Sequence, residues 1–78
     1  MLEIKVLGTG CAKCKRLEKM VRAICQKANI DASIEKVEDI NTIIEFGVVA
    51  TPSLVVNGVV KVTGRVPKED ELLSLLGQ

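Results

Sequence analysis

Hydrophobic and polar positions alternate at the beginning of the chain and then change to a helical repeat. The apolar residues at 2, 4 and 6 are separated by Glu3 and Lys5, which is the two-residue period of a β-strand. After Gly8-Thr9-Gly10, the apolar positions follow the 3.6-residue period of one helix face over about residues 12–28. These positions are Cys14, Leu17, Val21, Ile24, Cys25 and Ala28. The pattern therefore predicts a strand, a glycine-rich corner and a long amphipathic helix.

The next segment predicts a second strand and a short helix. Apolar residues at 32, 34 and 37 are typical of a weaker strand. Asp39 is a suitable N-cap for a helix through the apolar positions 40, 43, 44 and 46, and Gly47 is a suitable end.

The last third predicts a hairpin and a final helix. Asn57-Gly58 lies between two β-branched runs, and both residues of this dipeptide accept the positive φ that a tight hairpin turn requires. Pro67 suits the first turn of a helix that carries Leu72, Leu73, Leu75 and Leu76. The element order is βαβαββα, which predicts an α/β fold with one mixed four-stranded sheet and three helices. The first two strands are expected to be parallel, and the hairpin to add an antiparallel edge.

Composition limits the size of the core and the classes of partner. The chain has 78 residues, so we expect a single domain over 1–78 with a thin core. Eleven basic and ten acidic residues leave a net charge of +1, and Phe46 is the only aromatic residue, which argues against nucleic-acid binding. No apolar run is long enough to span a membrane, and the first residues resemble a strand more than a signal peptide. We therefore expect a cytoplasmic monomer without membrane contact.

The three cysteines carry the candidate chemistry. Histidine is absent, which removes the commonest metal ligand and general base. A close cysteine pair in the cytosol is more often catalytic or metal-binding than structural, and Cys11 and Cys14 form such a pair. Cys25 lies about 16 Å further along the predicted helix, on its apolar face, and is interpreted as a core residue.

Cys11-Ala12-Lys13-Cys14 follows a strand and opens a helix, which favours thiol–disulfide exchange. One helical turn brings the two sulfurs within bonding distance. The free N–H groups and the dipole at the helix start stabilise a thiolate on Cys11, and only the thiolate attacks a disulfide. Cys11 is thus the expected nucleophile, and Cys14, on the buried face, is the expected resolving thiol. The positive charge of Lys13 is expected to favour the Cys11 thiolate and so to make the disulfide more oxidising.

Two other hypotheses stay open on these residues alone. The pair could hold copper(I), or two chains could share their pairs in a zinc site with four thiolates. The cysteines could also be incidental to a non-catalytic interaction domain. No cofactor and no resident metal are expected under the redox hypothesis.

Further motifs add a resemblance to a known family. Gly8-Thr9-Gly10-Cys11-Ala12-Lys13-Cys14, Ala50-Thr51-Pro52, Val55-Val56-Asn57-Gly58 and Gly64-Arg65 occur in this order over nearly the whole chain. Together they resemble the thioredoxin/glutaredoxin superfamily, and more narrowly the very small redox-active disulfide proteins of archaea and bacteria.

The resemblance implies a thioredoxin-like fold and a disulfide oxidoreductase with a protein disulfide as substrate and an unidentified upstream reductase. It also implies a substrate groove. In that groove Thr51 offers backbone hydrogen bonds beside a cis peptide bond to Pro52, Gly10 forms the other lip, and Gly64 permits close approach of a loop. The chain departs from larger relatives in lacking a tryptophan before Cys11 and in having Lys5 near the position of their buried acidic residue.

Overall fold

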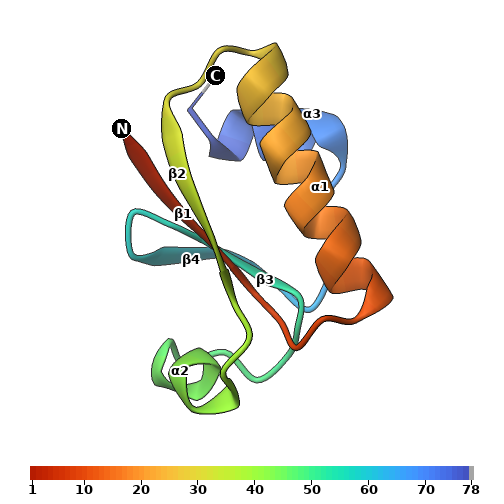
Figure 1. Cartoon of the computed structure of the whole chain (residues 1–78), viewed down its shortest axis with the longest axis vertical. Helices are drawn as coiled ribbons and strands as arrows, with labels where there is room; N and C mark the ends of the chain where they lie inside the picture. The colour runs from red at the N-terminus through yellow and green to blue at the C-terminus, as the bar shows by residue number, and fades with distance from the viewer. Residues whose placement is uncertain (78) are drawn as a thin grey trace.

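Seven elements follow one another in the predicted order. The computed structural model describes residues 1–77, and Figure 1 shows their arrangement. The elements are β1 (Leu2–Leu7), α1 (Ala12–Lys27), β2 (Ala32–Val37), α2 (Ile40–Glu45), β3 (Ser53–Val56), β4 (Val59–Thr63) and α3 (Glu69–Leu75).

The four strands form one mixed sheet in the order β2-β1-β3-β4. β1 pairs with β2 in parallel and with β3 in antiparallel orientation, and β3 pairs with β4 through the hairpin. Asn57 and Gly58 have φ of 50° and 81°, as the Asn-Gly signal requires. The predicted α/β architecture, a mixed four-stranded sheet with three helices, is therefore confirmed.

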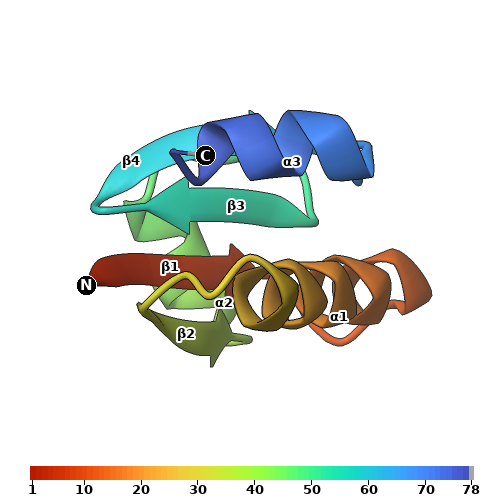
Figure 2. The same cartoon turned by 90° about the horizontal axis from the view of Figure 1, so that it is seen from above.

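The helices divide between the two faces of the sheet, α1 and α3 on one and α2 on the other (Figures 1 and 2). Alternate residues of β1 explain the division: Ile4 and Val6 belong to the core under α1 and α3, whereas Leu7 belongs to the core under α2. Every residue of β3 is buried because this strand is covered on both faces. The carboxyl end of β1 and the start of β3 meet at one end of the sheet, and the cysteine pair lies at this end.

The final helix begins later than its proline suggested. Lys68, and not Pro67, precedes the first helical residue, so Pro67 lies outside the first turn and our prediction for it is wrong. Pro67 is instead one of the fully buried side chains. Its ring is buried in the connection between β4 and α3, which the helix-start preference of proline does not reveal.

None of the helices in residues 1–77 is both long and apolar enough to cross a membrane.

Candidate active site

Cys11 occupies the N-cap of α1, at the corner between β1 and the helix. Its backbone is extended, and its Sγ accepts a hydrogen bond from the N–H of Cys14 at 3.1 Å. The side chain is exposed. A sulfur in this position takes one of the unpaired donors of the helix start and lies at the positive end of the dipole, so negative charge on it is stabilised.

Cys14 lies one turn further along, on the buried face of α1. Its exposed fraction is 4%, and it forms a disulfide with Cys11 across a Cα–Cα distance of 5.0 Å. The two sulfurs thus differ sharply in access, since only Cys11 faces solvent. Lys13, between them in sequence, is exposed, as its predicted modulating role requires.

Gly8 is essential to this packing for a reason that the sequence did not indicate. Gly10 has a positive φ of 90°, whereas Gly8 does not, so a special backbone conformation does not explain Gly8. A Cβ at Gly8 would instead collide with the Sγ of Cys14 and lie 2.9 Å from its Cβ. The same point lies 3.9 Å from the Cβ of Thr51, so residues 8, 14 and 51 meet around it.

Of the predicted groove residues, Thr51 lies near Cys14, since a Cβ at Gly8 would be close to both side chains. The Thr51–Pro52 bond is cis, Thr51 is exposed and Pro52 is buried. Within residues 1–77 the N–H and C=O of Thr51 form no backbone hydrogen bond, although β3 begins two residues later. The N–H of Gly64 donates to the carbonyl of Pro52 at 2.8 Å, and a Cβ at Gly64 would lie 3.1 Å from that of Ala50. The expected close approach at Gly64 is therefore present.

A hydroxyl network around the buried Ser53 fixes this loop, and sequence analysis missed it. Ser53 is fully buried, and its Oγ donates to the carbonyl of Ala50 at 2.7 Å. The Oγ of Ser53 lies 3.1 Å from Oγ1 of Thr63, which is also 3.4 Å from the Ala50 carbonyl. The network ties β3 and β4 to the residue just before Thr51, and its only sequence signal is a polar residue in an apolar strand.

We expect Ser53→Ala to weaken the binding of a protein disulfide more than the chemistry. Loss of the hydroxyl removes one buried hydrogen bond to Ala50, which should lower the free energy of unfolding by about 1–2 kcal/mol. Steady-state kinetics should show KM rising for a protein disulfide, with little change for a small disulfide that does not contact Thr51. Ser53→Thr is the control that retains the hydroxyl. An equal loss on both substrates would indicate that the network has no positioning role.

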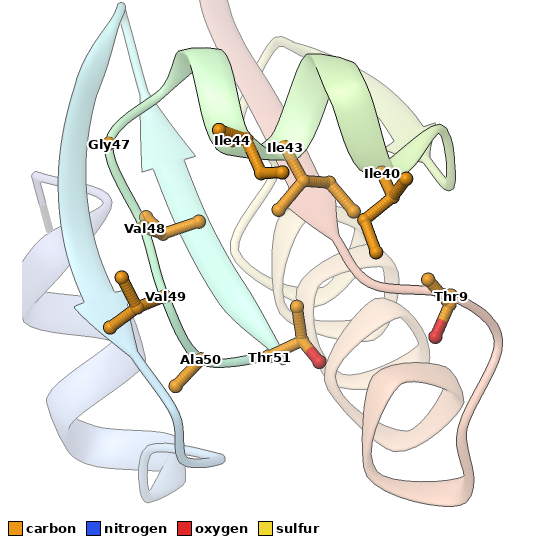
Figure 3. A pocket seen from close by; sticks show the side chains of 9 residues that line it. All are labelled: Thr9, Ile40, Ile43, Ile44, Gly47, Val48, Val49, Ala50 and Thr51. Atoms are coloured by element: carbon orange, nitrogen blue, oxygen red, sulfur yellow. The ribbon is translucent and has the colours of Figure 1, made fainter.

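An apolar groove adjoins Thr51 on the side of α2. It has a volume of ≈510 Å³ and is lined by Thr9, three isoleucines of α2 and the segment 47–51 (Figure 3). Ile40, Ile44 and Val49 are among the exposed large hydrophobic side chains, at 59%, 62% and 102%. The helical spacing of residues 40 and 44 was visible in the sequence. Their exposure to solvent could not be predicted from this spacing. In α2 only Ile43 is buried.

Cys25 takes no part in this site. It is 6% exposed and belongs to the core under α1 and α3, as predicted. Burial raises the pKa of its thiol, which keeps it protonated and unreactive. In the part of the chain that the structure describes, no group of three or more His, Cys, Asp or Glu side chains is placed to hold a metal ion.

Fold and site together define a class: a thioredoxin-fold protein with a redox disulfide at a helix N-terminus. The sequence matches the thioredoxin domain family over residues 2–77. It is 41% identical over 76 residues to a thioredoxin of Methanothermobacter thermautotrophicus, covering 97% of this chain and 99% of that protein. It is 36% identical over 72 residues to a thioredoxin of Methanocaldococcus jannaschii, covering 92% and 83%.

A solved structure supports the same fold. The crystal structure of Deadhead, the germline-specific thioredoxin of Drosophila melanogaster, superposes with a TM-score of 0.68 at 18% identity, covering 96% of this chain and 77% of that one. The chain belongs to the thioredoxin family and is a thioredoxin-type thiol–disulfide oxidoreductase with its disulfide between Cys11 and Cys14.

Proposed function

We propose that Cys11 is the attacking thiol and Cys14 the resolving thiol in the reduction of protein disulfides. The observation that carries the assignment is the difference in access: Cys11 is exposed at the N-cap, and Cys14 is 4% exposed beneath it. A bulky disulfide reaches only the outer sulfur. The N–H of Cys14 and the helix dipole favour the thiolate there.

The reaction proceeds in two exchanges. The Cys11 thiolate attacks one sulfur of the partner's disulfide, which forms a mixed disulfide and releases the other sulfur as a thiolate. Cys14, as thiolate, then attacks the Sγ of Cys11, which forms the Cys11–Cys14 disulfide and releases the first partner sulfur. Two electrons pass from the dithiol to the partner, whose thiolates take up the two protons lost by the cysteines. An external dithiol reductant returns the protein to its reduced state by the reverse exchanges.

We propose that the partner's chain binds beside the pair as an added strand. The backbone groups of Thr51 are free within residues 1–77 and lie next to the start of β3, which suits an extended segment. Gly10 forms the opposite lip of this groove. Pro52 and Gly64 fix the loop that carries Thr51. The groove of Ile40, Ile44 and Val49 would take an apolar side chain of the same segment. We infer a cytoplasmic location, since a third, unpaired cysteine is typical of a reducing compartment.

The proposed function is tested by electron stoichiometry. We expect the reduced protein to form one Cys11–Cys14 disulfide for each protein disulfide that it reduces, measured by thiol quantification and mass spectrometry of alkylated samples. The reduced protein should also carry no stoichiometric metal in elemental analysis. Stoichiometric copper or zinc together with loss of disulfide reduction would contradict the proposal and favour a metal-binding module.

A further inference from the structure

The first two turns of α1 carry a group of cations without partners. Lys13, Lys15, Arg16 and Lys19, which we call the α1 basic face, are all exposed. Among residues 1–77 none of them lies within 4.0 Å of a carboxylate, whereas five other cations of the chain do. Positive charge is therefore concentrated on the first two turns of α1, although the whole chain has a net charge of only +1. The carboxylate of Glu38 also lies near this corner, 3.2 Å from the position of a Cβ at Gly10, and it is 3.9 Å from Lys36.

The nearest acidic residue on the helix does not neutralise this face. Glu18 is held by Arg22 at 3.1 Å and by Lys36 at 3.9 Å. No acidic residue occurs in the first turn of α1. Cations at a helix N-terminus oppose the helix dipole, so the free protein is less stable with this arrangement than with acidic residues there. The α1 basic face therefore does not stabilise the start of α1 through the dipole, and its positive charge is available to the Cys11 thiolate and to a partner.

The two sides of the cysteine pair differ in chemistry. On one side, Lys15, Arg16 and Lys19 surround a shallow hollow of ≈380 Å³ on α1, together with Ala12 and Met20. On the other side lies the apolar groove, which is lined in part by α2. This helix has Asp39 at its N-cap and Glu45 as its last residue. A partner that covers the pair meets unpaired positive charge on one side and apolar side chains bordered by carboxylates on the other.

We propose that the α1 basic face selects protein partners that present acidic residues on one side of their reactive disulfide. The proposal rests on the function assigned to Cys11 above and names the partner class for that site. Acidic side chains over the α1 basic face place the partner's sulfur at Cys11 and its apolar side chain toward Ile40 and Ile44. The four cations act mainly on the encounter rate, because exposed charges steer association more than they add affinity.

The test compares two peptides with the same disulfide loop, one with Asp and Glu at the flanking positions and one with Lys. Rates are divided by those of a small neutral dithiol, which corrects for the intrinsic reactivity of each peptide. At about 10 mM salt, where the Debye length is about 30 Å, we expect the protein to favour the acidic peptide about tenfold. At about 1 M salt the preference should fall below about twofold.

Two variants with the same change in net charge locate the effect. Lys15→Glu with Arg16→Glu should abolish the preference for the acidic peptide. Lys27→Glu with Lys61→Glu should retain it, because Lys27 lies in the last turn of α1, about 24 Å along the helix axis from Cys11, and Lys61 lies on the edge strand β4. Loss of the preference in both variants, or its absence in the wild-type protein, would overturn the proposal.

Two further measurements separate this inference from the proposed function. Reduction of the neutral 2-hydroxyethyl disulfide depends on the dithiol and not on partner charge, so its failure would refute the redox assignment alone. Binding of a serine version of the acidic peptide to the oxidised protein involves no redox step. Its association rate should fall about threefold or more in the Lys15→Glu, Arg16→Glu variant at low salt, and an unchanged association rate would count against the inference.

Discussion

Serine in place of Cys11 is expected to lower the rate of disulfide reduction by roughly 10³-fold or more, whereas serine in place of Cys14 stops the reaction with the partner still attached. The difference follows from access. Cys11 carries the exposed sulfur, and no other cysteine in the described residues is exposed. Cys14→Ser keeps the backbone N–H that donates to the Sγ of Cys11, so the thiolate still forms and attacks, but no thiol is present to release the partner.

The measurement is the yield of mixed disulfide on non-reducing gels and by mass spectrometry, with a disulfide-bonded protein in excess. Cys14→Ser should accumulate a covalent complex that dithiothreitol releases, and Cys11→Ser should accumulate none. Cys25→Ala is the matched control, because Cys25 is buried away from the pair, and it should react as the wild-type protein does. A covalent complex through Cys14 in the Cys11→Ser variant would reverse the two roles.

Features that depend on near neighbours in the chain were predictable. The N-cap position of Cys11 and the buried side of Cys14 follow from a glycine-rich corner and a helical repeat, both of which are local patterns. The hairpin follows from the conformational freedom of Asn57-Gly58. These predictions hold because the same residues that carry the signal also form the structure.

Features that depend on contacts across the fold were not predictable from one sequence. Ser53 resembles an ordinary polar residue in a strand until Thr63 and the Ala50 carbonyl are brought to it by the β3–β4 pairing. Ile40 and Ile44 resemble core positions by their spacing. The helix that carries them, α2, has only six residues and buries only Ile43. In each case the sequence shows only that the residue is polar or apolar. Tertiary packing decides whether its side chain is buried, hydrogen-bonded or available to a partner.

Gly8 is the sharpest such case, and Gly8→Ala is expected to damage both stability and catalysis. The added methyl would overlap the Sγ of Cys14, so the end of β1 and the start of α1 must move apart. Overpacking of this kind costs about 1–3 kcal/mol of unfolding free energy. Because the displaced residue is the proposed resolving thiol, we expect the release of the mixed disulfide to slow as well, which a stopped-flow assay of partner release would measure.

A double-mutant cycle with Cys14→Ala identifies the sulfur as the cause. Under reducing conditions, where no disulfide contributes, the loss from Gly8→Ala should be smaller by about 0.5–3 kcal/mol once the sulfur is absent, measured by urea unfolding. Gly58→Ala is the comparison for a backbone effect, since Gly58 has φ of 81° but no atom within 4 Å of an added Cβ. It should lose about 1–2 kcal/mol while partner release stays at the wild-type rate. An equal loss from Gly8→Ala with and without the Cys14 sulfur would show that the glycine is required by the Cβ of residue 14, 2.9 Å from the added methyl, or by the backbone, and not by the thiol.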